Sequence, residues 1–146
     1  MQETIVFVCP HNAAKSVIAA AYFQQRADQL GLALHAVSAG TEPSPTVSAA
    51  VVEVLRKDGL DVAGYQPRLV TPEELTAAAR IVSLGSDLQA FVPATVAVDD
   101  WDDVPPPSQD LGAACQAIRA RVEQLITELQ VTGTTEEERR VGLWLR

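Results

Sequence analysis

Short apolar runs alternate with amphipathic segments along most of the chain. Four short runs are predicted as strands, at residues 5–8, 34–37, 81–84 and 95–98, and the first is apolar at every position. A run that is apolar at every position is typical of a strand buried on both faces, as in a parallel sheet. Strands that alternate with helices therefore predict an α/β fold, a three-layer sandwich around a four-stranded parallel sheet.

The segments between these runs carry helical spacing and helix-end signals. The predicted helices cover residues 16–30, a stretch from about Ser44 to just before Gly59, a short segment opened by Thr71, and residues 111–129. Thr71 can cap its helix and Glu74 stands three residues on, which is the spacing of a capping box. The last helix repeats its apolar positions at intervals of 4, 3, 4, 3 and 4 residues, which indicates one buried stripe.

Length and patterning indicate one domain followed by a short tail. A chain of 146 residues suits a single hydrophobic core. We assign residues 1–131 to the domain and residues 132–146 to a C-terminal tail, which can pack Leu143 and Trp144 on the domain, stay flexible or form a dimer contact. The acidic, proline-rich stretch 99–110 is predicted as a loop, because consecutive prolines cannot continue a helix or a central strand.

Composition argues against several function classes. The net charge of −8 disfavours general nucleic-acid binding, which needs a basic face. Two Cys cannot form a disulfide framework or a four-cysteine zinc site, and with two distant His they make no recognisable metal set. No apolar run approaches the roughly 20 residues of a membrane span, and the first residues lack the basic start of a signal peptide. We therefore expect a cytoplasmic protein with no metal, no cofactor and no membrane partner.

The segment between the first predicted strand and helix carries the candidate chemistry. After the candidate nucleophile Cys9 come Pro10, His11, Asn12, Ala13, Ala14, Lys15 and Ser16, the candidate oxyanion-binding residues. Ligands of open α/β sheets bind at the carboxyl ends of strands, and free N–H groups at a helix N-terminus favour an anion there. The same field favours the nucleophilic thiolate form of Cys9, Lys15 adds positive charge, and Ser16 can donate a hydrogen bond to the sulfur.

The cysteines and histidines also have structural interpretations. Cys9 can be an inert buried thiol at a strand end, as most free cysteines are. Cys115 lies on the apolar stripe of the last helix, so we expect a structural role for it. His11 can act as a ligand or acid or simply line the loop, whereas His35, within a strand, is expected to be structural.

At these residues the chain resembles the low-molecular-weight protein tyrosine phosphatases and the arsenate reductases that share their fold. The resemblance covers most of residues 4–130 and is carried by segments 5–9, 9–16, 37–41, 50–55, 59–62 and 68–70, with an Asp-rich loop around Trp101 before the final helix. It implies a low-molecular-weight phosphatase-like fold in which Cys9 attacks phosphorus or arsenic, the residue closing the loop binds the oxyanion, and a late Asp protonates the leaving oxygen. Asn12 matches the Asn that helps to hold the loop's shape in that family.

Three loop positions depart from the family pattern. Lys15 stands where the family has Arg, and it offers a point charge on a flexible stem instead of a planar fork that grips an oxyanion with two parallel bonds. His11 replaces a common Gly and can crowd the pocket or contact substrate. Ala14 replaces the second loop Cys of many members, which excludes a disulfide with Cys9 at this place.

The general acid has several candidates. The family pattern is an Asp directly before Pro, but alignment on Trp101 places Pro105 near that position. Asp103 is the nearest carboxylate. Its rivals on the same loop are Asp99, Asp100 and Asp102. Repulsion among neighbouring carboxylates raises a pKa, which suits an acid, although these residues can equally form a solvated acidic loop.

The preferred function is hydrolysis of phosphate monoesters of the phosphotyrosine type through a phosphocysteine at Cys9, with activity that Lys15 can weaken. The catalytic residues are then Cys9, Lys15, Ser16 and Asp103. One alternative is arsenate reduction with an external thiol, since segment 84–92 holds no Cys for an internal relay. Another is a degenerate, non-catalytic member that binds an oxyanion or phosphoprotein. The expected partner is a phosphorylated protein or a small phosphate or arsenate ion, bound by a monomer or weak homodimer.

Overall fold

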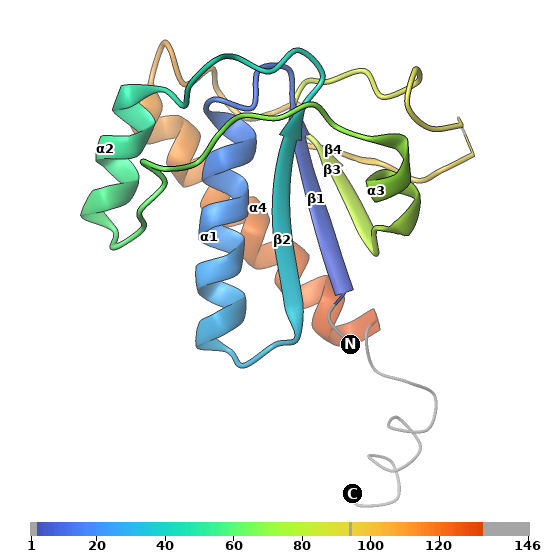
Figure 1. Cartoon of the computed structure of the whole chain (residues 1–146). Coiled ribbons are helices and arrows are strands. Elements are labelled where there is room, and N and C mark those ends of the chain that lie inside the picture. The colour runs from blue at the N-terminus through green and yellow to red at the C-terminus, as the bar shows by residue number, and fades with distance from the viewer. Residues whose placement is uncertain (1–2, 94, 133–146) are drawn as a thin grey trace, which may run out of the picture.

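A parallel sheet forms the centre of the protein in the computed structural model, which describes residues 3–93 and 95–132 (Figure 1). The elements along the chain are β1 Glu3–Cys9, α1 Lys15–Gln29, β2 Leu34–Gly40, α2 Ala49–Lys57, α3 Pro72–Ala77, β3 Arg80–Ser83, β4 Asp99–Asp100 and α4 Leu111–Thr132. The strands lie in the order β2-β1-β3-β4, and every pairing is parallel. The predicted α/β fold with a four-stranded parallel sheet is therefore confirmed.

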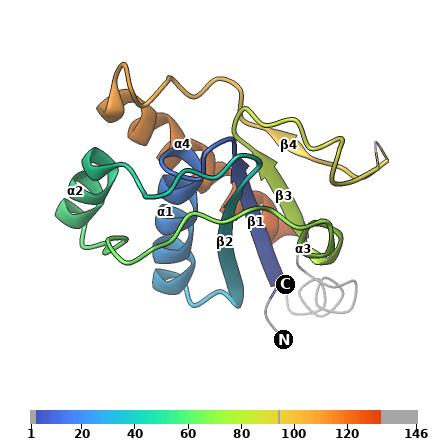
Figure 2. The same cartoon turned by 45° about the horizontal axis from the view of Figure 1, so that its top comes forward.

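The four strands end at one edge of the sheet, because all run in the same direction. Val8 of β1 pairs with Ala39 of β2 and with Ser83 of β3, and Ser83 in turn pairs with Asp100 of β4. Adjacent strands lie about 4.8 Å apart, so Asp100 is two strand spacings from Val8. Figure 2 brings this edge forward and shows the loops that follow the strands gathered there. This is the edge at which open α/β sheets bind ligands.

Helices cover the two faces of the sheet unequally (Figure 1). On one face α1, α2 and α4 share a large core cluster with β1, in which the ring of Phe7 lies 5.6 Å from that of Phe23 and 5.7 Å from that of Trp101. On the other face Val8 packs in a smaller cluster with α3 and segment 88–98. The sheet is thus the middle of three layers. Within the described residues, no helix is both long and apolar enough to cross a membrane.

Several predicted elements agree closely with the structure. Thr71 and Glu74 form the predicted capping box: the Glu74 nitrogen donates to Thr71 Oγ1, and the Thr71 nitrogen donates to the Glu74 carboxylate. Helix α4 begins at the predicted residue, Leu111, and continues to Thr132. The rest of the predicted tail, including its two candidate packing residues, lies outside the described residues.

The fourth strand lies later in the chain than the sequence predicts. The prediction at residues 95–98 is wrong, and β4 is Asp99–Asp100, at the start of the predicted loop. Val98 packs beside the smaller core cluster instead of pairing with β3. Asp99 can enter the sheet because Arg80 of β3 neutralises it, with Arg80 Nη2 2.5 Å from Asp99 Oδ2. A charge partner on a neighbouring strand therefore decides where β4 forms.

Helix α2 begins later than predicted, at Ala49 instead of near Ser44. The nitrogens of Ser44 and Ser48 donate to the carbonyl oxygens of His11 and Ala13, each at 2.9 Å. These bonds hold segment 44–48 against the loop that follows β1. Because its N–H groups bind that loop, the segment does not join the helix.

Candidate active site

Cys9 lies where β1 meets the N-terminus of α1. The residue is 4% exposed. Its Sγ lies 3.0 Å from Ser16 Oγ and accepts a hydrogen bond from the Ser16 nitrogen at 3.4 Å. A thiolate at this place accepts from both groups, and the dipole of α1 stabilises its negative charge. The expected contact between Cys9 and Ser16 is therefore present.

Asn12 organises residues 9–16, which we call the anion loop. Its φ of 50° lies in the left-handed region, which Asn tolerates better than most residues, and it is fully buried. Its Nδ2 donates to Ser16 Oγ at 2.8 Å, and its Oδ1 accepts from the Tyr65 hydroxyl at 2.9 Å and the Arg68 nitrogen at 3.0 Å. Since Ser16 Oγ already accepts from Asn12, its own proton is available to a thiolate at Cys9.

The backbone of the anion loop turns its carbonyl groups away from an anion. The carbonyl oxygens of Pro10, His11 and Ala13 accept hydrogen bonds from segment 42–48, at 2.7, 2.9 and 2.9 Å. Within the described part of the chain, the N–H groups of residues 11–14 donate to no protein acceptor. A loop with bound carbonyls and unpaired N–H groups beside a helix N-terminus provides the donors that a tetrahedral oxyanion needs.

Gly40 allows the anion loop to lie close to the end of β2. A Cβ at this position would lie 2.8 Å from the Pro10 carbonyl oxygen and 2.9 Å from Asn12 Cβ. Both contacts involve atoms of the anion loop that cannot move without distorting it. Any larger residue at position 40 therefore displaces the loop.

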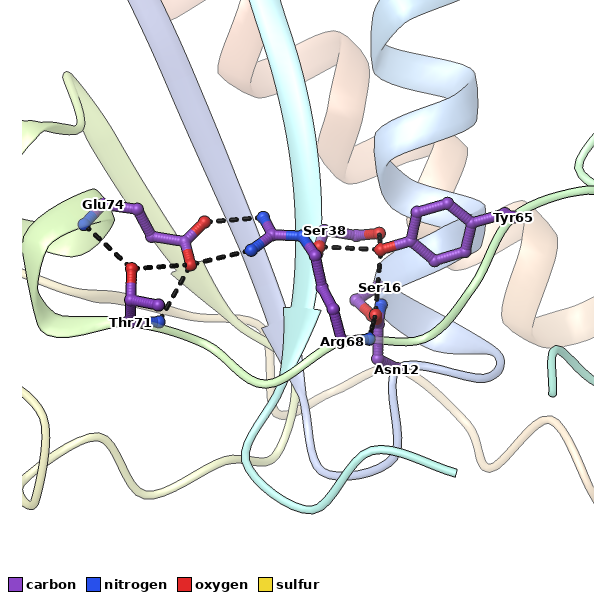
Figure 3. A network of polar contacts seen from close by, with 7 residues as sticks. All are labelled: Asn12, Ser16, Ser38, Tyr65, Arg68, Thr71 and Glu74. Atoms are coloured by element: carbon purple, nitrogen blue, oxygen red, sulfur yellow. Dashed lines mark hydrogen bonds and ion pairs between the residues drawn. The ribbon is translucent and has the colours of Figure 1, made fainter. Parts of the chain in front are cut away.

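Tyr65 and Arg68 connect the anion loop to β2 and α3 (Figure 3). Ser38 Oγ donates to the Tyr65 hydroxyl oxygen at 2.8 Å, and the Ser38 carbonyl oxygen lies 2.8 Å from the same hydroxyl. The Arg68 guanidinium donates twice to Glu74, at 2.9 and 2.6 Å. Burial acts to raise the pKa of Glu74, but hydrogen bonds from Arg68 and Thr71 outweigh it and lower that pKa. The charged pair thus anchors the segment that holds Asn12.

The side chain of Lys15 reaches from the anion loop to the loop that follows β3. A Cβ placed on Gly85 would be 3.9 Å from Lys15 Nζ. Among the described residues Lys15 makes no ion pair, so its charge remains available to a ligand. Lys15 thus offers a point charge, without the planar fork of Arg, at the edge of the site.

Ion pairs engage two of the four candidate acids. Asp99 pairs with Arg80, and Asp103 pairs with Arg121 of α4 at 2.8 Å. The Asp103 side chain is 63% exposed, and the hydrogen bonds from Arg121 lower its pKa. A carboxyl with a lowered pKa is a poor proton donor, so this pairing opposes the acid role that the sequence assigns to Asp103.

The other two candidate acids face a cleft. Asp100 and Asp102 are exposed and line a cleft of about 650 Å³, together with Gly85 and the residues that follow it. The buried ring of Trp101, between these two carboxylates, packs in the large core cluster.

The other cysteine and the loop histidine lie apart from this chemistry. Cys115 is buried in the core on α4, where burial raises the pKa of its thiol. His11 is exposed at the rim, and its Nδ1 lies 3.2 Å from the Glu42 carbonyl oxygen. Within residues 3–93 and 95–132, no group of three or more His, Cys, Asp or Glu residues is placed to hold a metal ion.

Four residues behind the loop, Ser38, Tyr65, Arg68 and Glu74, were not predicted from the sequence to act at Cys9. Tyr65 and Glu74 carry no signal of a role at Cys9, because they lie far along the chain. Ser38 and Arg68 fall within segments that carry the family resemblance. That resemblance is the sequence signal that could have pointed to a role for them near Cys9.

Comparison with known proteins identifies the family. The model of the family described as low molecular weight phosphotyrosine protein phosphatase matches residues 4–137. The chain belongs to this family. A relative from Halobacterium salinarum, named as a candidate arsenate reductase, is 29% identical over 125 residues, which cover 84% of this chain and 87% of the relative. The expected class, a phosphatase-like or arsenate-reductase-like enzyme, is therefore supported.

Solved structures show the same fold. YfkJ from Bacillus subtilis has a TM-score of 0.80 at 24% identity, over 90% of this chain and 97% of that one. A low molecular weight protein tyrosine phosphatase from T. tengcongensis has a TM-score of 0.79 at 22% identity, over 88% and 100%. A thioredoxin-dependent arsenate reductase from Corynebacterium glutamicum has a TM-score of 0.77 at 22% identity, over 90% and 63%.

Proposed function

We propose that the protein hydrolyses phosphate monoesters through a covalent intermediate on Cys9. The thiolate attacks phosphorus, the bond to the ester oxygen breaks, and a carboxylic acid protonates that oxygen. Water then cleaves the S–P bond and releases inorganic phosphate. The substrate is a phosphorylated protein or a small phosphate ester in the cytoplasm, and the protein acts as a monomer or weak homodimer.

The observation that carries this proposal is the polarity of the anion loop. The carbonyl oxygens of Pro10, His11 and Ala13 accept bonds from outside the loop, and within the described residues the N–H groups of residues 11–14 donate to no protein acceptor. Cys9 Sγ lies at the N-terminus of α1 beside Ser16. Such donors stabilise the charge that develops on the phosphoryl oxygens in the transition state. Lys15 contributes a further positive charge, in the place where the family has Arg.

For the general acid we propose Asp100 or Asp102 in place of Asp103. Both line the cleft beside the loop, and neither makes an ion pair among the described residues, whereas Asp103 is paired with Arg121. Replacing the true acid with Asn should slow esters with poor leaving groups more than activated esters. The Asp103→Asn variant is the matched control, and a selective effect there would restore Asp103 to the role.

Activity of the purified protein on para-nitrophenyl phosphate tests the proposal. We expect turnover that is abolished by Cys9→Ser and retained by Cys115→Ser, the matched control. Absence of turnover at high enzyme concentration contradicts hydrolysis and leaves arsenate reduction or the non-catalytic binding function. Binding of inorganic phosphate to the unmodified protein then tests the binding function.

Arsenate reduction is the second candidate, favoured by the relative from Halobacterium salinarum. The Cys9 sulfur would attack arsenic with loss of water. An external thiol would then attack that sulfur, and the S–As electron pair would remain on arsenic, which leaves as arsenite. A second external thiol would release Cys9 from the mixed disulfide. Arsenite formation that requires added thiol and Cys9, without turnover of aryl phosphate, would favour this function.

A further inference from the structure

A cleft of about 650 Å³ opens at the carboxyl ends of β3 and β4, beside the anion loop. At Gly85 the cleft lies next to Lys15, because a Cβ placed on Gly85 would be 3.9 Å from Lys15 Nζ. Another part of its lining is Asp100, at the end of β4. A substrate whose phosphoryl group occupies the anion loop therefore has this cleft as the adjacent space for its leaving group.

The cleft combines an apolar lining with acidic groups. Its apolar residues are Leu88, Val92, Pro93, Val96 and Val98. Its acidic residues are Asp87, Asp100 and Asp102. A further lining residue, Ser86, has a buried Oγ that finds no hydrogen-bond partner among the described residues. The apolar and acidic parts of the lining thus match a ligand that has an apolar body and a positive charge.

The two arginines near this acidic lining are engaged by other carboxylates, and Lys15, at the Gly85 end of the cleft, serves the phosphoryl group in the proposed function. Arg80 is engaged with Asp99 and Glu128, and Arg121 is engaged with Asp103. In the part of the chain that the structure describes, the three cleft carboxylates make no ion pair. Their field therefore favours a cationic ligand and disfavours an anionic one.

We propose that this cleft selects phosphate esters whose leaving group carries a positive charge on an apolar body, such as an arylalkyl or alkyl ammonium group. The proposal rests on the proposed function, because it assigns the leaving group of that reaction. The carboxylates are exposed, so each contributes a modest attraction, and together they favour the cationic over the neutral leaving group by about 5- to 30-fold.

Three phenyl phosphates that differ in the para substituent test this selection. The substituents are aminomethyl (cationic), methyl (neutral) and carboxymethyl (anionic). We expect kcat/KM to fall in that order, and the differences to shrink at high salt. The affinity of Cys9→Ser for the same three compounds, measured by calorimetry, should follow the same order without requiring turnover.

The Asp87→Asn variant probes the cleft without touching the proposed acids. Asp87 accepts a hydrogen bond from the nitrogen two residues on, and exposed Asp61, far from the cleft, does the same. Asp61→Asn is therefore the matched control. Asp87→Asn should lower the preference for the cationic compound about 2- to 5-fold, and Asp61→Asn should leave it unchanged.

The outcomes separate the two proposals. Turnover that is insensitive to substituent charge, or equal effects of Asp87→Asn and Asp61→Asn, overturns the cleft assignment and leaves hydrolysis standing. Absence of turnover with all three compounds overturns hydrolysis, and the Cys9→Ser affinities then decide the cleft assignment: a cationic preference supports it, and equal affinities overturn it.

Discussion

Replacing Tyr65 with Phe removes one hydroxyl from the hydrogen-bond network behind the anion loop. That hydroxyl lies 2.9 Å from Asn12 Oδ1 and 2.8 Å from both Ser38 Oγ and the Ser38 carbonyl oxygen. Asn12 in turn holds Ser16, which contacts the Cys9 sulfur. We expect the substitution to change the reactivity of a sulfur that Tyr65 does not touch.

The size of the effect follows from these contacts. A typical internal hydrogen bond contributes about 0.5–1.5 kcal/mol, and a buried group left without its partner costs about 1–3 kcal/mol. Asn12 Oδ1 keeps the hydrogen bond from the Arg68 nitrogen. The cost of removing its other partner therefore lies near the lower end of the second range, at about 1 kcal/mol. We therefore expect Tyr65→Phe to lower the free energy of unfolding by about 1–3 kcal/mol, which lowers Tm by roughly 2–4 °C per kcal/mol.

The decisive measurement is the rate of Cys9 alkylation by iodoacetamide at one fixed pH, followed by mass spectrometry. With Asn12 less firmly held, Ser16 donates less well to a thiolate at Cys9, so Tyr65→Phe should be alkylated more slowly than the wild type. Tyr22→Phe is the matched control, because the Tyr22 hydroxyl donates to Asp58 at 2.6 Å, away from the anion loop. Two variants with similar losses of Tm and the same rate of Cys9 alkylation would refute the reasoning.

Three further substitutions test the charge of Lys15, the ion pair between Arg68 and Glu74, and the close contact of Gly40 with the anion loop. Lys15→Arg should raise turnover of aryl phosphate by about 10²-fold, because a planar fork replaces a point charge; an unchanged rate would show that charge geometry at this position does not limit catalysis. The pKa of Glu74 is lowered from 4.5 in the folded state, so its ion pair with Arg68 stabilises the fold above about pH 4.5 and loses effect as pH falls through the folded value. Urea unfolding should therefore show a stability difference between wild type and Glu74→Gln at pH 7 that closes in acid; a constant difference would contradict this. Gly40→Ala should cost about 1–3 kcal/mol and reduce activity, because its Cβ meets the Pro10 carbonyl; unaltered stability and activity would contradict the close approach.

The parts of the fold that the sequence predicts well depend on short stretches of chain. The capping box at Thr71 and Glu74 involves residues three apart, and its hydrogen bonds form as predicted. The anion loop likewise lies within a few residues of Cys9, between a strand and a helix whose apolar patterns are plain. Local hydrogen bonds and periodicity are properties of the chain itself, so a sequence can reveal them.

The parts of the fold that the sequence predicts poorly depend on partners far along the chain. Asp99 enters β4 because of Arg80, which precedes it by 19 residues, and Asp103 is engaged by Arg121, which follows it by 18. The acidic residues of this segment look alike in the sequence. Their environments differ only because folding places these two arginines next to two of them. The structure therefore decides which carboxylates face the cleft and which are paired.

The sequence by itself determined the candidate nucleophile, the anion loop and its Lys in place of Arg, because these residues are neighbours along the chain. Only the tertiary structure showed how the loop is held. Tyr65 reaches Asn12 across 53 residues, and the bond exists because β2 and the segment before α3 lie against the loop. The reactivity of a residue at one end of a strand thus depends on contacts that only folding brings together.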